Sequence, residues 1–151
     1  QITLAAAESC TGGLIAYRIT SVSGSSAYFL GSVVAYANAM KTSLLGVRNE
    51  TLETRGAVSE ACAREMAEGI RQRTGATITV STTGIAGPTG ATARKPVGLI
   101  YVACASPQGT HVYEKHWHGD RLANMRDATE FALELVIDAA SRLRRGEGEH
   151  V

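Results

Sequence analysis

Residues 2–13 read ITLAAAESCTGG, an apolar run that passes into a polar loop and ends on two glycines. A helical pattern follows over Leu14–Ile19, so the stretch predicts a strand, a loop and a helix. In such a unit Ser9 and Thr11 lie at the mouth of a helix N-terminus, where unpaired N–H groups favour an anion. The same groups would stabilise the oxyanion formed when a serine hydroxyl attacks a carbonyl. The alternative is an ordinary helix cap, because Ser and Thr commonly precede helices.

The rest of the chain continues the alternation of strands and helices. Apolar periodicity and turn signals predict the following elements: a helix over Leu14–Val22, a strand over Tyr28–Tyr36, a helix capped by Asn38 and ending at Gly46, a polar surface segment over Val47–Gly56, a helix over Glu60–Thr74 capped by Ser59, a strand over Thr77–Ser81, an irregular segment over Thr82–Gly98, hairpin strands over Leu99–Ala105 and Thr110–His118, and a long helix capped by Asp120.

This order predicts one α/β domain with a three-layer α/β/α architecture. The hairpin near the end makes the sheet mixed, although mostly parallel. We expect the domain to span residues 1–145, with a flexible tail over 146–151 in a segment that frays from Arg144. The last helix carries an apolar stripe over Leu122, Met125, Thr129, Leu133, Val136, Ala140 and Leu143.

Composition limits the classes of function. Hydrophobic residues make up 44% of the 151 residues and charged residues 19%, which is typical of a globular domain. Fifteen basic and fourteen acidic residues leave a net charge of +1, so no broad nucleic-acid or membrane surface is expected. The three cysteines are scattered and odd in number, which favours a reducing, cytoplasmic location over a disulfide scaffold.

Polar segments follow three of the predicted strands, at Glu8–Gly13, Tyr36–Lys41 and Thr83–Gly90. Ligands of open α/β sheets bind beyond the carboxyl ends of parallel strands, so we expect these segments to converge. Lys41 is predicted in the first turn of its helix, where the helix dipole and partial burial lower a lysine pKa. Such a lysine can act as the general base for a serine, and the pair needs neither a histidine nor a metal. The alternative is a solvated surface lysine.

Other side chains offer weaker possibilities. Cys10 is a rival nucleophile beside Ser9, and its thiol would gain thiolate character at a helix N-terminus. His116 and His118 share one predicted strand face, but a pair of only two ligands indicates a solvated face better than a metal site. Arg121 and Arg126 lie early in the last helix, where either guanidinium could bind a phosphate.

Six motifs in matching order resemble the CinA C-terminal domain family, and the likeness extends from about Leu4 to about Leu143. The motifs are Ala7–Gly13, Val34–Tyr36 with Lys41, Gly56–Ser59, Thr83–Pro88, Lys95–Gly98 and Gly119–Arg121. The family also occurs as a stand-alone nicotinamide-nucleotide amidase. Its members carry a helix before the first strand, so this chain is expected to be a piece of a longer protein.

The resemblance implies an enzyme of pyridine-nucleotide (NAD) salvage that hydrolyses the carboxamide of nicotinamide mononucleotide to nicotinic acid mononucleotide and ammonia. By this likeness Ser9 matches the nucleophile and Lys41 its base, while Tyr36 and Thr83 line the same site. Thr11, Gly12, Gly13 and Gly84 are expected at the substrate, together with Arg121 or Arg126. No cofactor is implied, the partner is a small nucleotide, and a homo-oligomer, most often a dimer, is expected.

Two other readings stay open. The glycine loops could cradle a phosphate in a non-catalytic regulatory domain of a competence- or damage-inducible protein. A cysteine amidohydrolase that uses Cys10 is the third reading.

Overall fold

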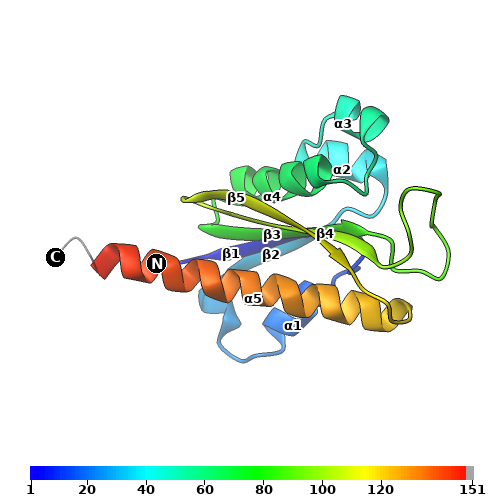
Figure 1. The fold of residues 1–151 in the computed structure, drawn as a ribbon. Helices are drawn as coiled ribbons and strands as arrows, with labels where there is room; N and C mark the ends of the chain where they lie inside the picture. The colour runs from blue at the N-terminus through cyan, green and yellow to red at the C-terminus, as the bar shows by residue number, and fades with distance from the viewer. Residues whose placement is uncertain (149–151) are drawn as a thin grey trace.

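The computed structural model describes residues 1–148, in which five strands form one sheet with helices on both faces (Figure 1). The elements, in chain order, are β1 (Leu4–Glu8), α1 (Leu14–Thr20), the 3₁₀ helix η1 (Ser25–Ala27), β2 (Phe29–Val34), α2 (Asn38–Leu45), α3 (Asn49–Thr54), α4 (Glu60–Thr74), β3 (Ile78–Gly84), β4 (Leu99–Ser106), β5 (Gly109–His116) and α5 (Arg121–Gly148).

The strand order is β2-β1-β3-β4-β5, and β1 pairs in parallel with both of its neighbours. β3 pairs antiparallel with β4, and β4 antiparallel with β5, so β4 alone runs against the other strands. The predicted mixed sheet is therefore confirmed. Its consequence is that β1, β2 and β3 end at the same edge, where their following loops meet.

Helices cover the two faces of the sheet unequally. α1 and α5 lie on one face, and α2, α3 and α4 lie on the other (Figure 1). The alternation of side chains along β1 divides the core between them, with Ala6 packed on the α5 side and Ala5 and Ala7 on the α4 side. Both faces are apolar, which explains the continuous hydrophobic run of β1.

β3 carries hydroxyl groups on the face that packs against α4. The Thr79, Ser81 and Thr83 hydroxyls donate to the main-chain carbonyls of Ala67, Ala63 and Ala57 at 2.8, 2.6 and 2.8 Å. All three hydroxyl residues are buried. We call this row of hydrogen bonds the hydroxyl ladder. It holds α4, and the turn that precedes it, in a fixed position along the strand.

Several predicted helix ends are confirmed. The Ser59 hydroxyl accepts from the Cys62 N–H at 3.2 Å, and the Asp120 carboxylate accepts from the Ala123 N–H at 2.8 Å. Gly46 ends α2 in the left-handed conformation, with φ of 72°. The prediction for Asn38 is wrong, because α2 begins there and its N-cap is Ala37.

Four other expectations are corrected. Val47–Gly56 contains α3, since Val47 and Thr51 are buried and anchor a segment that looked uniformly polar. β3 continues to Gly84, because its hydroxyls are satisfied by the α4 side of the core. Leu122 is 70% exposed and lies outside the apolar stripe of α5. That helix continues to Gly148, and the remainder of the expected tail, 149–151, lies outside the described residues.

Removing one member of the hydroxyl ladder should weaken the fold by a measurable amount. Ser81→Ala deletes a buried donor, and a net hydrogen bond contributes about 1 kcal/mol, so we expect the free energy of unfolding to fall by about that much. Urea unfolding followed by circular dichroism measures it. Ser43→Ala, an exposed serine on α2, is the matched control with no expected change. Equal stability of the two variants would contradict a structural role for the ladder.

Candidate active site

A cavity of about 280 Å³ lies where the ends of β1, β2 and β3 meet. Each of the three polar segments predicted to converge contributes to it, which confirms that prediction. The residues lining it are Ser9, Cys10, Tyr36, Asn38, Lys41, Ala57, Val58, Thr83, Gly84, Ile85, Ala86, Thr89, Gly90 and Arg121. The wall formed by Ala57 and Val58 was not predicted, although its residues belong to a motif that the sequence shares with the family.

Ser9 and Lys41 meet in this cavity. The Lys41 Nζ donates to the Ser9 Oγ at 3.0 Å and to the Tyr36 carbonyl at 2.9 Å. Both side chains are almost inaccessible, since Ser9 is 7% and Lys41 2% exposed. The alternative of a solvated surface lysine is therefore wrong.

The burial of Lys41 depends on a close approach of two helices. Gly69 of α4 lies so near the end of α2 that a Cβ there would come within 1.8 Å of the Leu45 carbonyl oxygen. Glycine at this position lets α2 lie directly against α4. The aliphatic part of Lys41 is covered by this packing, and its amine reaches the edge of the sheet.

Burial lowers the pKa of Lys41 below its ordinary value, and the thiols of Cys62 and Cys10 partly oppose that shift. Because the N-cap of α2 is Ala37, Lys41 lies one position further into the helix than predicted. Desolvation, not the helix dipole, is the largest cause of its lowered pKa. Among residues 1–148 no carboxylate forms an ion pair with Lys41. A lysine in these surroundings can be neutral and accept a proton.

Cys10 lies beside Ser9 but differs from it chemically. Burial, as the largest cause, raises the pKa of the Cys10 thiol to about 12. The thiol therefore stays protonated at neutral pH, and the expected thiolate character at a helix N-terminus is not found. Cys62, on α4, behaves likewise, with its pKa raised to about 11 mainly by burial.

The N-terminus of α1 is not open to a ligand, contrary to the sequence prediction. The Glu8 carboxylate occupies it and accepts from the N–H groups of Ile15 at 2.8 Å and Ala16 at 3.2 Å. Glu8 was taken as part of the loop, but it is the last residue of β1 and is fully buried. A charged side chain within the protein thus replaces the external anion that the sequence pattern suggested.

Three predicted substrate residues lie behind the cavity and do not line it. The Thr11 hydroxyl bonds to the Glu8 carboxylate at 2.8 Å and to the Thr82 hydroxyl at 2.9 Å, and Thr11 is 1% exposed. Gly12 and Gly13 have φ of 60° and 103° and turn the chain into α1. Thr11, Gly12 and Gly13 therefore support the loop that carries Ser9.

Thr83 and Gly84 line the cavity at the end of β3. The Thr83 hydroxyl is already engaged, because it donates to Ala57 in the hydroxyl ladder. Gly84 gives no room for a side chain, since a Cβ would lie 2.5 Å from Ile100. Both residues shape the floor of the cavity.

Arg121, at the start of α5, reaches the cavity, whereas Arg126 is exposed and does not line it. The Arg121 guanidinium donates to the Gly87 carbonyl at 2.8 Å and to the Tyr36 hydroxyl at 3.2 Å. Tyr36 therefore contacts Lys41 through its carbonyl and Arg121 through its ring hydroxyl. The sequence analysis missed Asn124, which is fully buried and donates to the Ala86 carbonyl at 3.0 Å.

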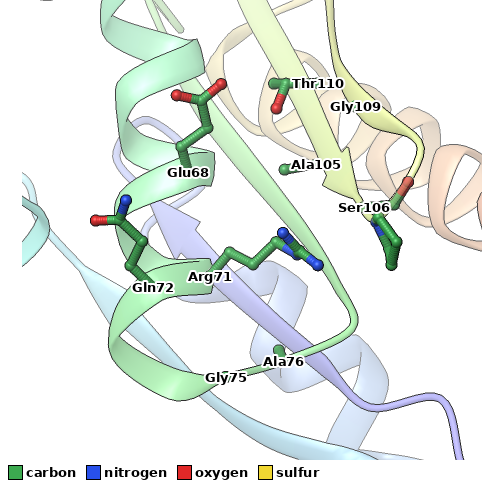
Figure 2. Close-up of a pocket in the computed structure, with 10 residues that line it drawn as sticks. Glu68, Arg71, Gln72, Gly75, Ala76, Ala105, Ser106, Gly109 and Thr110 are labelled. Carbon is green, nitrogen blue, oxygen red and sulfur yellow. The ribbon is translucent and has the colours of Figure 1, made fainter.

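A second cavity, of about 480 Å³, lies at the opposite end of the sheet, between α4 and the β4–β5 turn (Figure 2). Figure 2 shows Arg71 extending from α4 toward Ser106 at this turn, and the Arg71 Nε donates to the Thr77 carbonyl at 3.2 Å. The cavity contains no lysine, histidine or cysteine. Its hydroxyl residues, Ser106 and Thr110, form no hydrogen bond with the Glu68 carboxylate within residues 1–148, whereas Ser9 and Lys41 are in contact, so the Ser9 cavity is the candidate active site.

Residues 1–148 form neither a metal-binding cluster nor a membrane-spanning helix. No group of three or more His, Cys, Asp and Glu side chains there could hold a metal ion. Exposed His116 lies 3.7 Å from the Glu114 carboxylate, and His118 is also exposed. Within the same residues, every helix is too short or too polar to cross a bilayer.

Comparison with known proteins places this geometry in a family. The model of the CinA C-terminal domain matches residues 1–140. A CinA-like protein of Salinibacter ruber is 53% identical over 132 residues, which are 87% of this chain and 32% of that protein. A CinA-like protein of Koribacter versatilis is 52% identical over 89% of this chain and 32% of its own length. The chain thus spans about a third of the curated relatives that it matches.

Solved structures give the same result. The competence/damage inducible protein CihA of Agrobacterium tumefaciens superposes with a TM-score of 0.89 at 42% identity, covering 91% of this chain and 84% of that one. A competence damage-inducible protein A from Klebsiella pneumoniae has a TM-score of 0.89 at 33% identity, covering 93% and 87%.

The buried amine should make stability depend on pH in a defined direction. Because the pKa of Lys41 is lowered in the folded state, Lys41 binds more protons in the unfolded chain than in the folded one. The free energy of unfolding therefore increases as the pH rises from the pKa of the folded state to that of the unfolded state. Lys41→Met lacks this contribution. We expect the free energy of unfolding of the parent, relative to that of Lys41→Met, to increase between neutral and alkaline pH. Urea titrations of both proteins measure this difference. Parallel pH profiles would contradict a lowered pKa.

Proposed function

Because this chain belongs to the CinA C-terminal domain family and its cavity holds a serine and a lysine at hydrogen-bond distance, we propose that it is an amidohydrolase. Its proposed substrate is nicotinamide mononucleotide, whose carboxamide it converts to nicotinic acid mononucleotide and ammonia. The observation that carries the proposal is the contact of 3.0 Å between the Lys41 Nζ and the Ser9 Oγ. It joins a nucleophile to the base that can activate it.

The proposed reaction begins with a neutral Lys41. Its amine donates one N–H to the Tyr36 carbonyl, which can leave the nitrogen lone pair toward the Ser9 hydroxyl. The Ser9 oxygen attacks the carboxamide carbon while its proton passes to Lys41. The tetrahedral intermediate then expels the amide nitrogen, which takes that proton and leaves as ammonia, so that an acyl-serine ester remains.

A water molecule completes the cycle. Lys41 accepts a proton from the water as its oxygen attacks the ester, and the proton then goes to the departing Ser9 oxygen. Negative charge develops on the carbonyl oxygen in both halves of the reaction. The N–H groups of Cys10 and Thr11 follow the nucleophile directly and donate to no main-chain carbonyl within residues 1–148, so they are the proposed oxyanion donors.

The size and charge of the cavity support a mononucleotide. Its volume of about 280 Å³ is near the lower end of small-molecule sites, which begin at about 300 Å³. Arg121 is the proposed phosphate ligand, because guanidinium groups bind phosphate in a bidentate manner. The sheet edge thus offers a reactive pair and a separate cation to one small ligand.

The two other functions that the sequence suggested are a cysteine amidohydrolase and a non-catalytic phosphate-binding domain. A cysteine amidohydrolase is disfavoured by the protonated, buried thiol of Cys10. A non-catalytic phosphate-binding domain could also use a lysine beside a serine, and it is the outcome if the purified chain binds the nucleotide without releasing ammonia. A cytoplasmic location, a homo-oligomeric state and a role in NAD salvage stay predictions.

Ser9→Ala and Lys41→Ala should each reduce ammonia release by at least about 1,000-fold, because members of a catalytic pair act as a unit. The assay follows ammonia and nicotinic acid mononucleotide released from nicotinamide mononucleotide. Ser141→Ala on α5 and Lys115→Ala on β5 are matched changes away from the cavity and should keep turnover, provided circular dichroism shows all variants folded. Full activity in either cavity variant would exclude the proposed pair.

Arg121→Ala should raise the KM for nicotinamide mononucleotide by about 10- to 100-fold, the effect of losing charge-assisted hydrogen bonds. Arg126→Ala, five residues further along α5, is the matched control and should keep the parental KM. The nucleoside without its phosphate separates two roles. An equal loss with that substrate would show that Arg121 acts by holding Gly87 and would contradict phosphate binding.

A further inference from the structure

Glu8 is a charged residue that the proposed chemistry does not use. It is 0% exposed, and its carboxylate accepts four hydrogen bonds. Oε1 accepts from the Ile15 N–H and the Thr11 hydroxyl, both at 2.8 Å, and Oε2 accepts from the Ser32 hydroxyl at 2.7 Å and the Ala16 N–H at 3.2 Å. No cation forms an ion pair with it within residues 1–148. Burying a charge is costly, so such complete compensation calls for an explanation.

The four donors come from three parts of the chain. Ile15 and Ala16 open α1, Ser32 belongs to the edge strand β2, and Thr11 lies in the loop that follows Ser9. The Thr11 hydroxyl also reaches the Thr82 hydroxyl on β3 at 2.9 Å. The carboxylate therefore ties the loop to a helix and a strand, and Thr11 ties it to a second strand.

This network surrounds the proposed nucleophile without touching it. The main chain at residues 8 and 9 is held on both sides, since the Ala35 N–H donates to the Glu8 carbonyl at 2.8 Å and the Ser9 N–H to the Thr82 carbonyl at 3.0 Å. The Gly12 N–H then closes the loop onto the Ser9 carbonyl at 3.0 Å. Side chains alternate along the strand, so Glu8 points toward α1 and Ser9 toward Lys41 on the other face.

We infer that Glu8 is a positioning residue: its carboxylate, acting through Thr11, holds the Ser9 hydroxyl and the N–H groups of Cys10 and Thr11 in the orientation that reaction requires. The inference rests on the proposed function of the same cavity. Small displacements of reacting groups reduce rates strongly, whereas a binding pocket formed by other segments tolerates them better. Loss of the carboxylate should therefore lower kcat far more than it raises KM.

The first test is steady-state kinetics of Glu8→Gln with nicotinamide mononucleotide. Glutamine keeps the size but loses the charge and replaces an acceptor by a donor facing the Ala16 N–H. We expect kcat to fall about 10- to 100-fold with KM within about threefold of the parent. Thr11→Val, which removes the link and keeps the shape, should lower kcat about tenfold and decides the matter if Glu8→Gln does not fold.

Two controls separate positioning from a loss of stability or charge. Val136→Ala on α5 opens the core on the same face of the sheet and should lower the melting temperature while leaving kcat unchanged. Glu130→Gln removes a carboxylate that pairs with Arg18 of α1 and should also keep kcat. The inference would be overturned if Glu8→Gln and Thr11→Val both fold and keep the parental kcat. It would also be overturned if Val136→Ala lost as much kcat at the same stability.

A second readout does not depend on the substrate. A small alkyl fluorophosphonate forms an Oγ–P bond with an activated serine and releases fluoride, while the serine proton passes to the base. Mass spectrometry should find the label on Ser9 of the parent, formed about 10-fold or more slowly in Glu8→Gln. A parent that is labelled but releases no ammonia would refute the amidase alone. Equal labelling of both proteins would refute the positioning role, and a parent with neither reaction would refute both.

Discussion

The contact between the amine of Lys41 and the hydroxyl of Ser9 depends on nearly every other feature of the fold. The two residues are 32 positions apart, and they meet because β2 lies beside β1 and leads directly into α2. Lys41 is 2% exposed, and Gly69 lets the end of its helix, α2, lie directly against α4. Burial alone thus lowers the pKa of this amine, with no second charged group beside it in residues 1–148.

The sheet also separates two buried ionisable groups that would otherwise neutralise each other. Glu8 and Ser9 are neighbours in sequence, yet the strand directs the carboxylate to α1 and the hydroxyl to the opposite face. The carboxylate is satisfied by N–H and hydroxyl dipoles, and Lys41 by a hydroxyl and a carbonyl. An ion pair between Glu8 and Lys41 would hold the amine protonated, so the division of the two faces preserves its basicity.

Much of this arrangement follows from local sequence patterns. Alternating strand and helix patterns predicted the α/β architecture, and the carboxyl-end rule predicted the convergence of the polar segments on one cavity. The errors arose where a polar residue is buried by partners distant in sequence. Glu8 looked like a loop residue because its compensating donors include Ser32, and Thr51 looked exposed although the Glu65 carboxylate accepts its hydroxyl at 2.7 Å. The choice between Arg121 and Arg126 needed the direction of α5, which periodicity leaves open.

The hydroxyl ladder matches the repeat distance along α4 to the repeat distance along β3. Two residues of β3, from Thr79 to Ser81, advance about 6.6 Å, and the four residues of α4 from Ala63 to Ala67 advance about 6 Å. The two repeats nearly coincide, so successive hydroxyls find successive carbonyls, and sliding α4 by one residue would break the match at every rung. The last rung, from Thr83 to Ala57, lies in the wall of the cavity. The spacing of the hydroxyl ladder therefore fixes where this wall of the cavity lies relative to β3.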